Sequence, residues 1–176
     1  MLLKLVKIEL KLPWVGGIEG MWEADEVEAK AAWELYVELI TRVSIVELRP
    51  DEGLLREALD SFYSLFKTTR GILRQYGPGV GKPKGEGNLS FGLLAIAVVN
   101  TVLRPILSKW HPLLEDYEST KPAGVSPLAH ERAWDKAPEL RGVLNAARET
   151  LMRYAGILAE VAGVPSSLPP NGDLVE

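Results

Sequence analysis

The thirteen residues from Phe91 to Leu103 are apolar nearly all round, and this pattern predicts a helix that is buried on every side. A membrane-spanning helix needs about 20 such residues, so this run is too short to be interpreted as one. It is better interpreted as the central helix of a soluble core. Other helices must then surround it, and the fold has to be mainly helical.

Helical periodicity and capping signals divide the rest of the chain after the N-terminus. The expected helices cover residues 25–43, 51–76, 88–117, 126–134 and 138–163. Asp25 and Glu28 form a capping box at the start of the first helix, and Gly163 ends the last one. Pro105 should kink or break the helix that continues the central run.

The N-terminal segment has a different period. Residues 6–12 alternate apolar and polar side chains, which is typical of a half-buried strand. Pro13 interrupts the alternation, Gly16 and Gly17 offer a hairpin turn, and residues 18–22 form a weak return strand. Because a lone two-stranded hairpin is marginal in water, it must lie on the helices or pair with another chain.

These elements predict a mainly α protein, an antiparallel bundle of four to five helices with a small N-terminal β-hairpin. The length of 176 residues fits one domain, and 47% hydrophobic with 25% charged residues is ordinary for a globular chain. The expected units are the hairpin at residues 1–24, the bundle at 25–164 and a flexible tail at 165–176.

The composition excludes several kinds of site. The chain has no cysteine and two histidines, which rules out disulfides, a thiol nucleophile, iron–sulfur clusters and zinc sites of the Cys or three-His type. A net charge of −4 argues against a general polyanion binder. The start of the chain lacks the apolar core of a signal peptide. We therefore expect a cytoplasmic protein with no membrane contact, metal or cofactor.

Basic side chains gather around the glycine-rich loop at residues 77–88. Arg70 and Arg74 share one helix face before the loop, and Lys82 and Lys84 lie within it. This cluster is either a contact for an anion or an acidic partner, or the solvated end of a helix, where cations are favoured.

Polar side chains continue the apolar run along one helix face. At 100° per residue, Asn100, Arg104 and His111 lie within about 40° of one another if the helix survives Pro105. Buried Asn and Arg side chains need partners, so we expect a polar network inside the bundle. Glu115 follows closely enough to join it.

Arg104 and His111, with six residues between them, resemble the Arg-x4-6-His motif of the HEPN family, helical bundles that include metal-independent ribonucleases. The resemblance implies that Arg104 would stabilise phosphate charge and that His111 would transfer protons to or from ribose oxygens. Such sites are typically assembled across a dimer. Pro105 departs from the family's pattern, which commonly has a polar residue after the Arg. The alternative is that both side chains are structural.

Four strings resemble an all-helical bacterial module that is associated with multi-component conflict or signalling systems. The strings are Ala32–Leu39, Leu55–Leu59, Leu103–Pro112 (L-R-P-I-L-S-K-W-H-P) and His130–Trp134 (H-E-R-A-W). The resemblance covers about residues 5–164. It implies an accessory role beside separate effectors, and it carries over no activity and no catalytic residue.

Two functions are compatible with these patterns. The first is a non-catalytic interaction or regulatory subunit of a bacterial defence or signalling assembly, in which the N-terminal strand, Trp14 and Trp22 contact another chain as a homo-oligomer or a hetero-complex. The second is a HEPN-like ribonuclease that uses Arg104 and His111, and only this one would bind nucleic acid. An open cleft holding both side chains would support the second, and burial of both with filled hydrogen bonds would exclude it.

Overall fold

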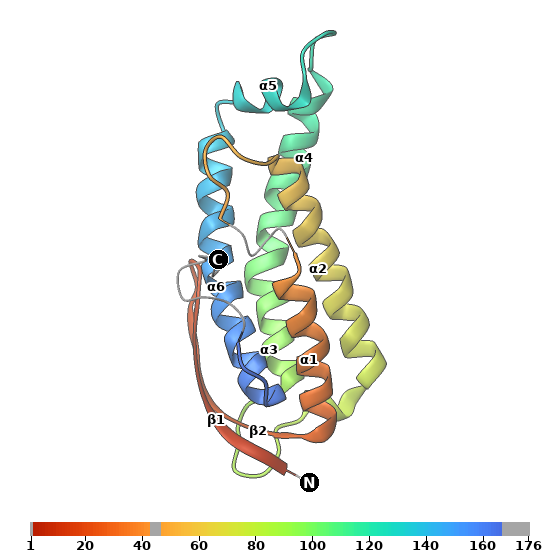
Figure 1. Ribbon diagram of the computed structural model, residues 1–176, viewed down its shortest axis with the longest axis vertical. Helices are drawn as coiled ribbons and strands as arrows, with labels where there is room; N and C mark the ends of the chain where they lie inside the picture. Colours follow the sequence, from red (N-terminus) through yellow and green to blue (C-terminus); the bar gives the residue numbers. More distant parts are fainter. Residues whose placement is uncertain (1, 43–46, 167–176) are drawn as a thin grey trace.

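The computed structural model describes residues 2–42 and 47–166, and it shows a mainly helical protein with an N-terminal antiparallel hairpin (Figure 1). The elements are β1 (Leu2–Leu12), β2 (Gly16–Asp25), α1 (Glu26–Ile40), α2 (Leu55–Tyr76), the short 3₁₀ turn η2 (Pro78–Gly81), α3 (Phe91–Val98), the π-helical turn η3 (Val99–Leu103), α4 (Arg104–Ser119), α5 (Pro127–Arg132) and α6 (Ala137–Ala162). The expected class, helices with a small hairpin, is confirmed. Val43, the expected end of the first helix, and residues 167–176 of the expected tail lie outside the described residues.

The long helices α1, α2, α6 and the continuous α3–η3–α4 helix run lengthwise beside one another, while α5 crosses one end (Figure 1). Leu94 and Val102 of the central run are fully buried. The expectation that this run is buried on every side was wrong, because Leu93 and Ile96 are nearly half exposed. No described helix covers that face of α3. By length and composition alone, Phe91–Ser119 is the one helix among the described residues that could cross a membrane, and half of its most apolar window is buried.

Pro105 neither breaks the central helix nor ends it. The turn before it widens to a π-helical turn, in which the Arg104 N–H donates to the carbonyl of Val99. A proline ring normally clashes with the carbonyl one turn earlier and leaves it without a donor. Widening that turn is a known way for a helix to absorb such a local defect, so the chain continues into α4 in nearly the same direction.

The hairpin turn lies earlier than Gly16 and Gly17, where the sequence predicted it. Leu12 pairs with Gly16, so the loop is residues 13–15 and both strands are longer than expected. The alternation of β1 is confirmed, since Val6, Ile8 and Leu10 are buried against the helices. The core thus extends from the helices to the inner face of the hairpin.

One buried carboxylate, that of Glu28, connects the hairpin to the helices. Its side chain is 1% exposed and accepts hydrogen bonds from the Trp22 indole at 3.3 Å and from the Phe91 N–H at 3.0 Å. Lys84 forms an ion pair with it at 2.8 Å. Asp25 and Glu28 complete the predicted capping box of α1. Two stretches distant in sequence, residues 22–28 and residues 84–91, therefore meet at one side chain.

We predict that Glu28→Ala lowers the free energy of unfolding by about 3–5 kcal/mol, because it leaves Lys84, the Trp22 indole and the Phe91 N–H without their shared acceptor. Urea unfolding measures the change. Glu26→Ala removes an exposed carboxylate from the same helical turn and should cost less than about 1 kcal/mol. Equal losses in the two variants would contradict the role assigned to Glu28.

Candidate functional sites

His111 lies on α4 in contact with α2, and its partner is Arg56. The Arg56 guanidinium lies 2.6 Å from His111 Nδ1 and holds Glu118 through two hydrogen bonds of 2.9 and 2.8 Å. The bonds that Arg56 donates to Glu118 raise the pKa of Arg56, and the charge of Glu115 adds to the effect. The ring of Tyr63 stacks on the imidazole with 6.1 Å between the centroids.

This arrangement limits what His111 can do chemically. Because a guanidinium only donates, His111 Nδ1 accepts the bond, and the neutral imidazole carries its hydrogen on Nε2. In this contact the Nδ1 lone pair is engaged by Arg56. The geometry suits a positioned donor and does not provide the general base that a ribonuclease needs.

Arg104 contacts a different set of residues. Its Nε donates to Asn100 Oδ1 at 3.1 Å. Its guanidinium lies over the Phe66 ring, 5.5 Å from the ring centroid, and the guanidinium of Arg70 lies over the same ring at 5.8 Å. Asn100 and Arg104 are exposed. The expected buried network was therefore wrong in location, because the π-helical turn and the uncovered face of the helix place these side chains at the surface.

The predicted members of that network divide into two groups. Arg104 pairs with Asn100, whereas His111 pairs with Arg56. Glu115 is exposed, and its charge acts on Arg56. Within the described part of the chain, no hydrogen bond or ring contact joins Arg104 to His111.

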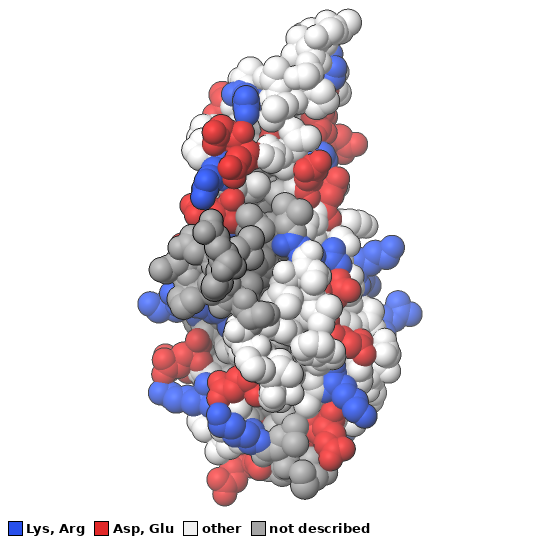
Figure 2. All heavy atoms as spheres, in the orientation of Figure 1, with Lys and Arg blue, Asp and Glu red and all other residues white. Residues whose placement is uncertain are grey.

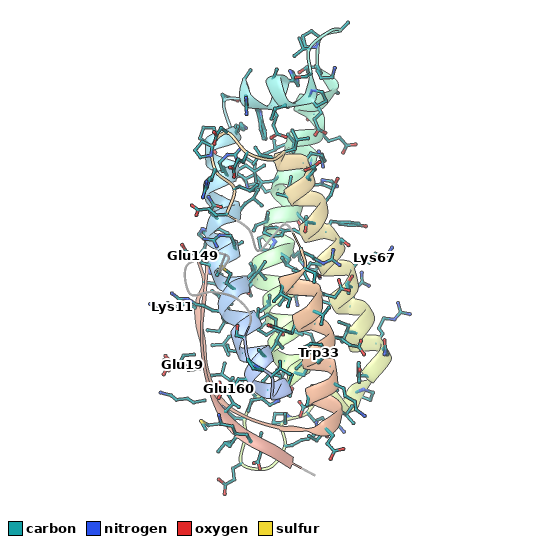
Figure 3. The ribbon with its side chains drawn as sticks, viewed as in Figure 1. Lys11, Glu19, Trp33, Lys67, Glu149 and Glu160 are labelled. Atoms are coloured by element: carbon teal, nitrogen blue, oxygen red, sulfur yellow. The ribbon has the colours of Figure 1, made fainter. Side chains whose placement is uncertain are left out.

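The basic cluster also divides. Lys84 is partly buried and forms ion pairs with Glu28 and Asp25, so it serves the fold. Arg70, Arg74 and Lys82 are exposed, and the described residues give them no ion pair. Figure 3 shows Lys67, a further basic residue of α2, projecting outward from this helix. These cations remain available to solvent.

The hairpin tip carries the most exposed aromatic side chain. Trp14 is 60% exposed and its φ is +67°, the only positive φ of a non-glycine residue in the described chain. Val15 beside it is 61% exposed. Trp22, also predicted to be an interface residue, is fully buried and bonded to Glu28. That prediction was wrong because Trp22 lies opposite Val6, on the face of the hairpin that packs against the helices.

Glu131 is a buried residue whose role the sequence did not indicate. His130 and Glu131 are 9% and 6% exposed. Glu131 accepts the N–H groups of Leu55 at 2.7 Å and Arg56 at 3.3 Å, so it caps the start of α2. Leu54 at the N-cap position has no polar side chain that could accept these N–H groups. An apolar N-cap residue is the one sequence feature that indicates an acceptor from elsewhere in the chain.

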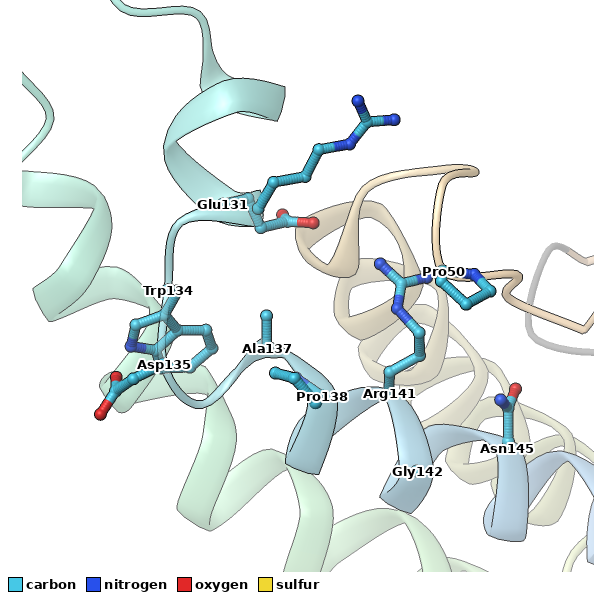
Figure 4. A pocket seen from close by; sticks show the side chains of 10 residues that line it. Pro50, Glu131, Trp134, Asp135, Ala137, Pro138, Arg141, Gly142 and Asn145 are labelled. Carbon is cyan, nitrogen blue, oxygen red and sulfur yellow. The ribbon is translucent and has the colours of Figure 1, made fainter.

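Two hollows meet at Glu131. A larger one of about 490 Å³ lies over the start of α6, with Arg141 and Asn145 pointing toward the loop that contains Pro50 (Figure 4). Arg141 donates to the carbonyls of Arg49 and Glu52. A smaller one of about 240 Å³ lies between α2, α4 and α5. Arg141 in the larger hollow thus holds this loop in place.

No group of three or more His, Asp or Glu side chains that could hold a metal ion occurs among residues 2–42 and 47–166. No protein family, curated protein or solved structure matches this chain. Any function assigned to it must therefore be argued from its own contacts and exposed groups.

We predict that Glu131→Ala lowers the free energy of unfolding by about 1–3 kcal/mol, since it leaves the buried Leu55 N–H without an acceptor. Thermal or urea unfolding measures the loss. Arg132→Ala alters the adjacent exposed residue, and it should cost clearly less. If the two variants are equally stable, the capping role of Glu131 is refuted.

Proposed function

We propose that the protein is an antiparallel helical bundle that acts as a non-catalytic interaction or regulatory subunit of a bacterial multi-component assembly, and that it binds another protein through the tip of its hairpin. The observation that carries the proposal is Trp14, a large aromatic side chain that is mostly exposed on a backbone with positive φ.

The conformation of Trp14 is costly in two ways. A non-glycine residue in the left-handed region is strained by about 1–2 kcal/mol. An exposed indole also forgoes the stabilisation that burial of so large an apolar surface would give. Tryptophan is among the residues that contribute most to protein interfaces. Both costs are accounted for if the ring is buried by a partner.

The tip is presented on a rigid support. The two strands are paired from the tip back to Asp25, and their inner side chains Val6, Ile8 and Leu10 are buried. Glu28 then joins β2 to α1 and α3. A partner that binds Trp14 would therefore contact a preorganised surface, which lowers the entropic cost of binding.

The ribonuclease alternative has less support from the geometry. Arg104 and His111 contact different residues, and Arg56 occupies the Nδ1 atom of His111. Arg104 and His111 do not line either of the hollows at Glu131, so the shared open cleft that would support a ribonuclease is missing there. The two side chains are also not both buried, which is the condition that would exclude a ribonuclease.

We predict that Trp14→Gly abolishes capture of the partner while leaving the free energy of unfolding within about 1 kcal/mol of the wild type, because glycine adopts positive φ without strain. The measurement is an affinity pull-down of the tagged protein from its native host, with mass spectrometry of the eluate and unfolding of each purified variant.

Trp33→Ala is the matched control, because Trp33 is another half-exposed indole on α1, and this variant should retain the partner. An RNA-length assay on the same eluates tests the alternative. RNA cleavage that survives purification and disappears in His111→Ala would overturn the proposal, as would partner capture that Trp14→Gly leaves unchanged.

A further inference from the structure

We infer that two copies of this chain associate through the outer edge of β1, antiparallel and centred on Ile8, so that the two hairpins form one four-stranded sheet. The inference goes beyond the binding proposed for the tip, since it uses backbone groups and charges in the middle of β1.

The outer edge of β1 presents unpaired backbone groups. In an antiparallel pair, successive residues point their N–H and C=O groups alternately toward the partner strand and away from it. The carbonyl of Lys11 points away from β2, because the Thr150 hydroxyl donates to it at 3.1 Å. By alternation, Lys7 and Glu9 also point to the outer edge, and no described residue hydrogen-bonds to their backbone groups there.

The opposite edge supports this assignment. Met21 faces Lys7 across the hairpin, and its carbonyl points away from β1 to accept the N–H groups of Asn88 and Leu89, both at 2.9 Å. The Met21 N–H donates to the Asn88 side chain. The loop before α3 thus covers the edge of β2, whereas within the described chain the edge of β1 is engaged only at Lys11.

The outward side chains, together with the engaged carbonyl of Lys11, favour one register. Centring the pair on Leu10 would set Glu9 opposite Lys11 of the second copy, but the Lys11 carbonyl on that edge is already bonded to Thr150. If the twofold axis between the two β1 strands passes through Ile8, Lys7 of each copy lies opposite Glu9 of the other, which gives two such pairs. Centring on Lys7 would set two lysines against each other, and centring on Glu9 would set two glutamates against each other. Like charges directly opposite are destabilising, and opposite charges are favourable. Each of the three registers centred on Lys7, Ile8 and Glu9 sets outward-pointing backbone groups opposite one another, so the charges decide between them.

The second copy would also relieve an unfavourable feature of the single hairpin. Glu9 lies directly across from Glu19 of β2, a like-charge pair, and the one ion pair that the described residues give Glu9 is with Lys7 on the same strand. Charges of both signs alternate along the hairpin side of the molecule (Figure 2). A second copy would add a lysine on the open side of Glu9 and place Lys11 beside the exposed Leu5.

The test is sedimentation equilibrium of the full-length chain and two charge reversals, Lys7→Glu and Glu9→Lys. Wild type should form a dimer. Each variant alone should dimerise at least about tenfold more weakly, because two favourable pairs become repulsive. An equimolar mixture of the two variants should form a heterodimer, since every opposing pair is then of opposite sign.

Lys11→Glu is the matched control, because it makes the same charge change on the same strand but faces Leu5, and its dimer should be unchanged. The heterodimer cannot result from altered stability of a single hairpin, so it separates pairing between copies from folding. A wild-type chain that stays monomeric, a dimer insensitive to both reversals, or variants that do not associate when mixed would each overturn the inference. None of these results bears on Trp14.

Discussion

The structure depends on the burial of one carboxylate. Glu28 is almost completely removed from water, and a buried charge is tolerated only when it is paired and its hydrogen bonds are filled. The groups that fill them come from β2, from the loop before α3 and from the first residue of α3. This requirement holds the hairpin against the helices, which a two-stranded sheet could not achieve by itself.

The same contact explains why the hairpin is asymmetric. Lys84 anchors the glycine-rich loop at Glu28, and the end of that loop, Asn88 and Leu89, hydrogen-bonds to the edge of β2. The edge of β1 is left open along Lys7 and Glu9. Lys11 and Glu19 project from the hairpin away from the helices (Figure 3). A rigid hairpin with one open edge, that of β1, and an exposed tip suits binding between proteins better than it suits catalysis.

Local signals made much of the fold predictable, and long-range contacts made the rest unpredictable. Asp25 with Glu28, Ser126 and Gly163 mark helix ends through bonds to neighbouring residues, so these boundaries could be read from the sequence. The cap of α2 could not, because Glu131 supplies it from 76 residues away.

The candidate site was harder still to predict. Helical spacing indicates the pairing of Arg104 with Asn100 four residues earlier. It does not indicate that His111, which lies in α4 together with Arg104, has Arg56 of α2 as its partner. Trp14 was predicted to be an interface residue from its type alone, and its positive φ became visible only once the turn was placed at 13–15.

Native-state hydrogen exchange tests most directly whether the hairpin is part of the core and so presents its tip and edge in fixed positions. The amides to follow are those of Trp22 in β2 and Phe91 at the start of α3. The account predicts that both exchange only through global unfolding, with the same free energy as the amides of α6. Exchange of Trp22 at a much lower free energy would show that the hairpin opens on its own and would contradict the account.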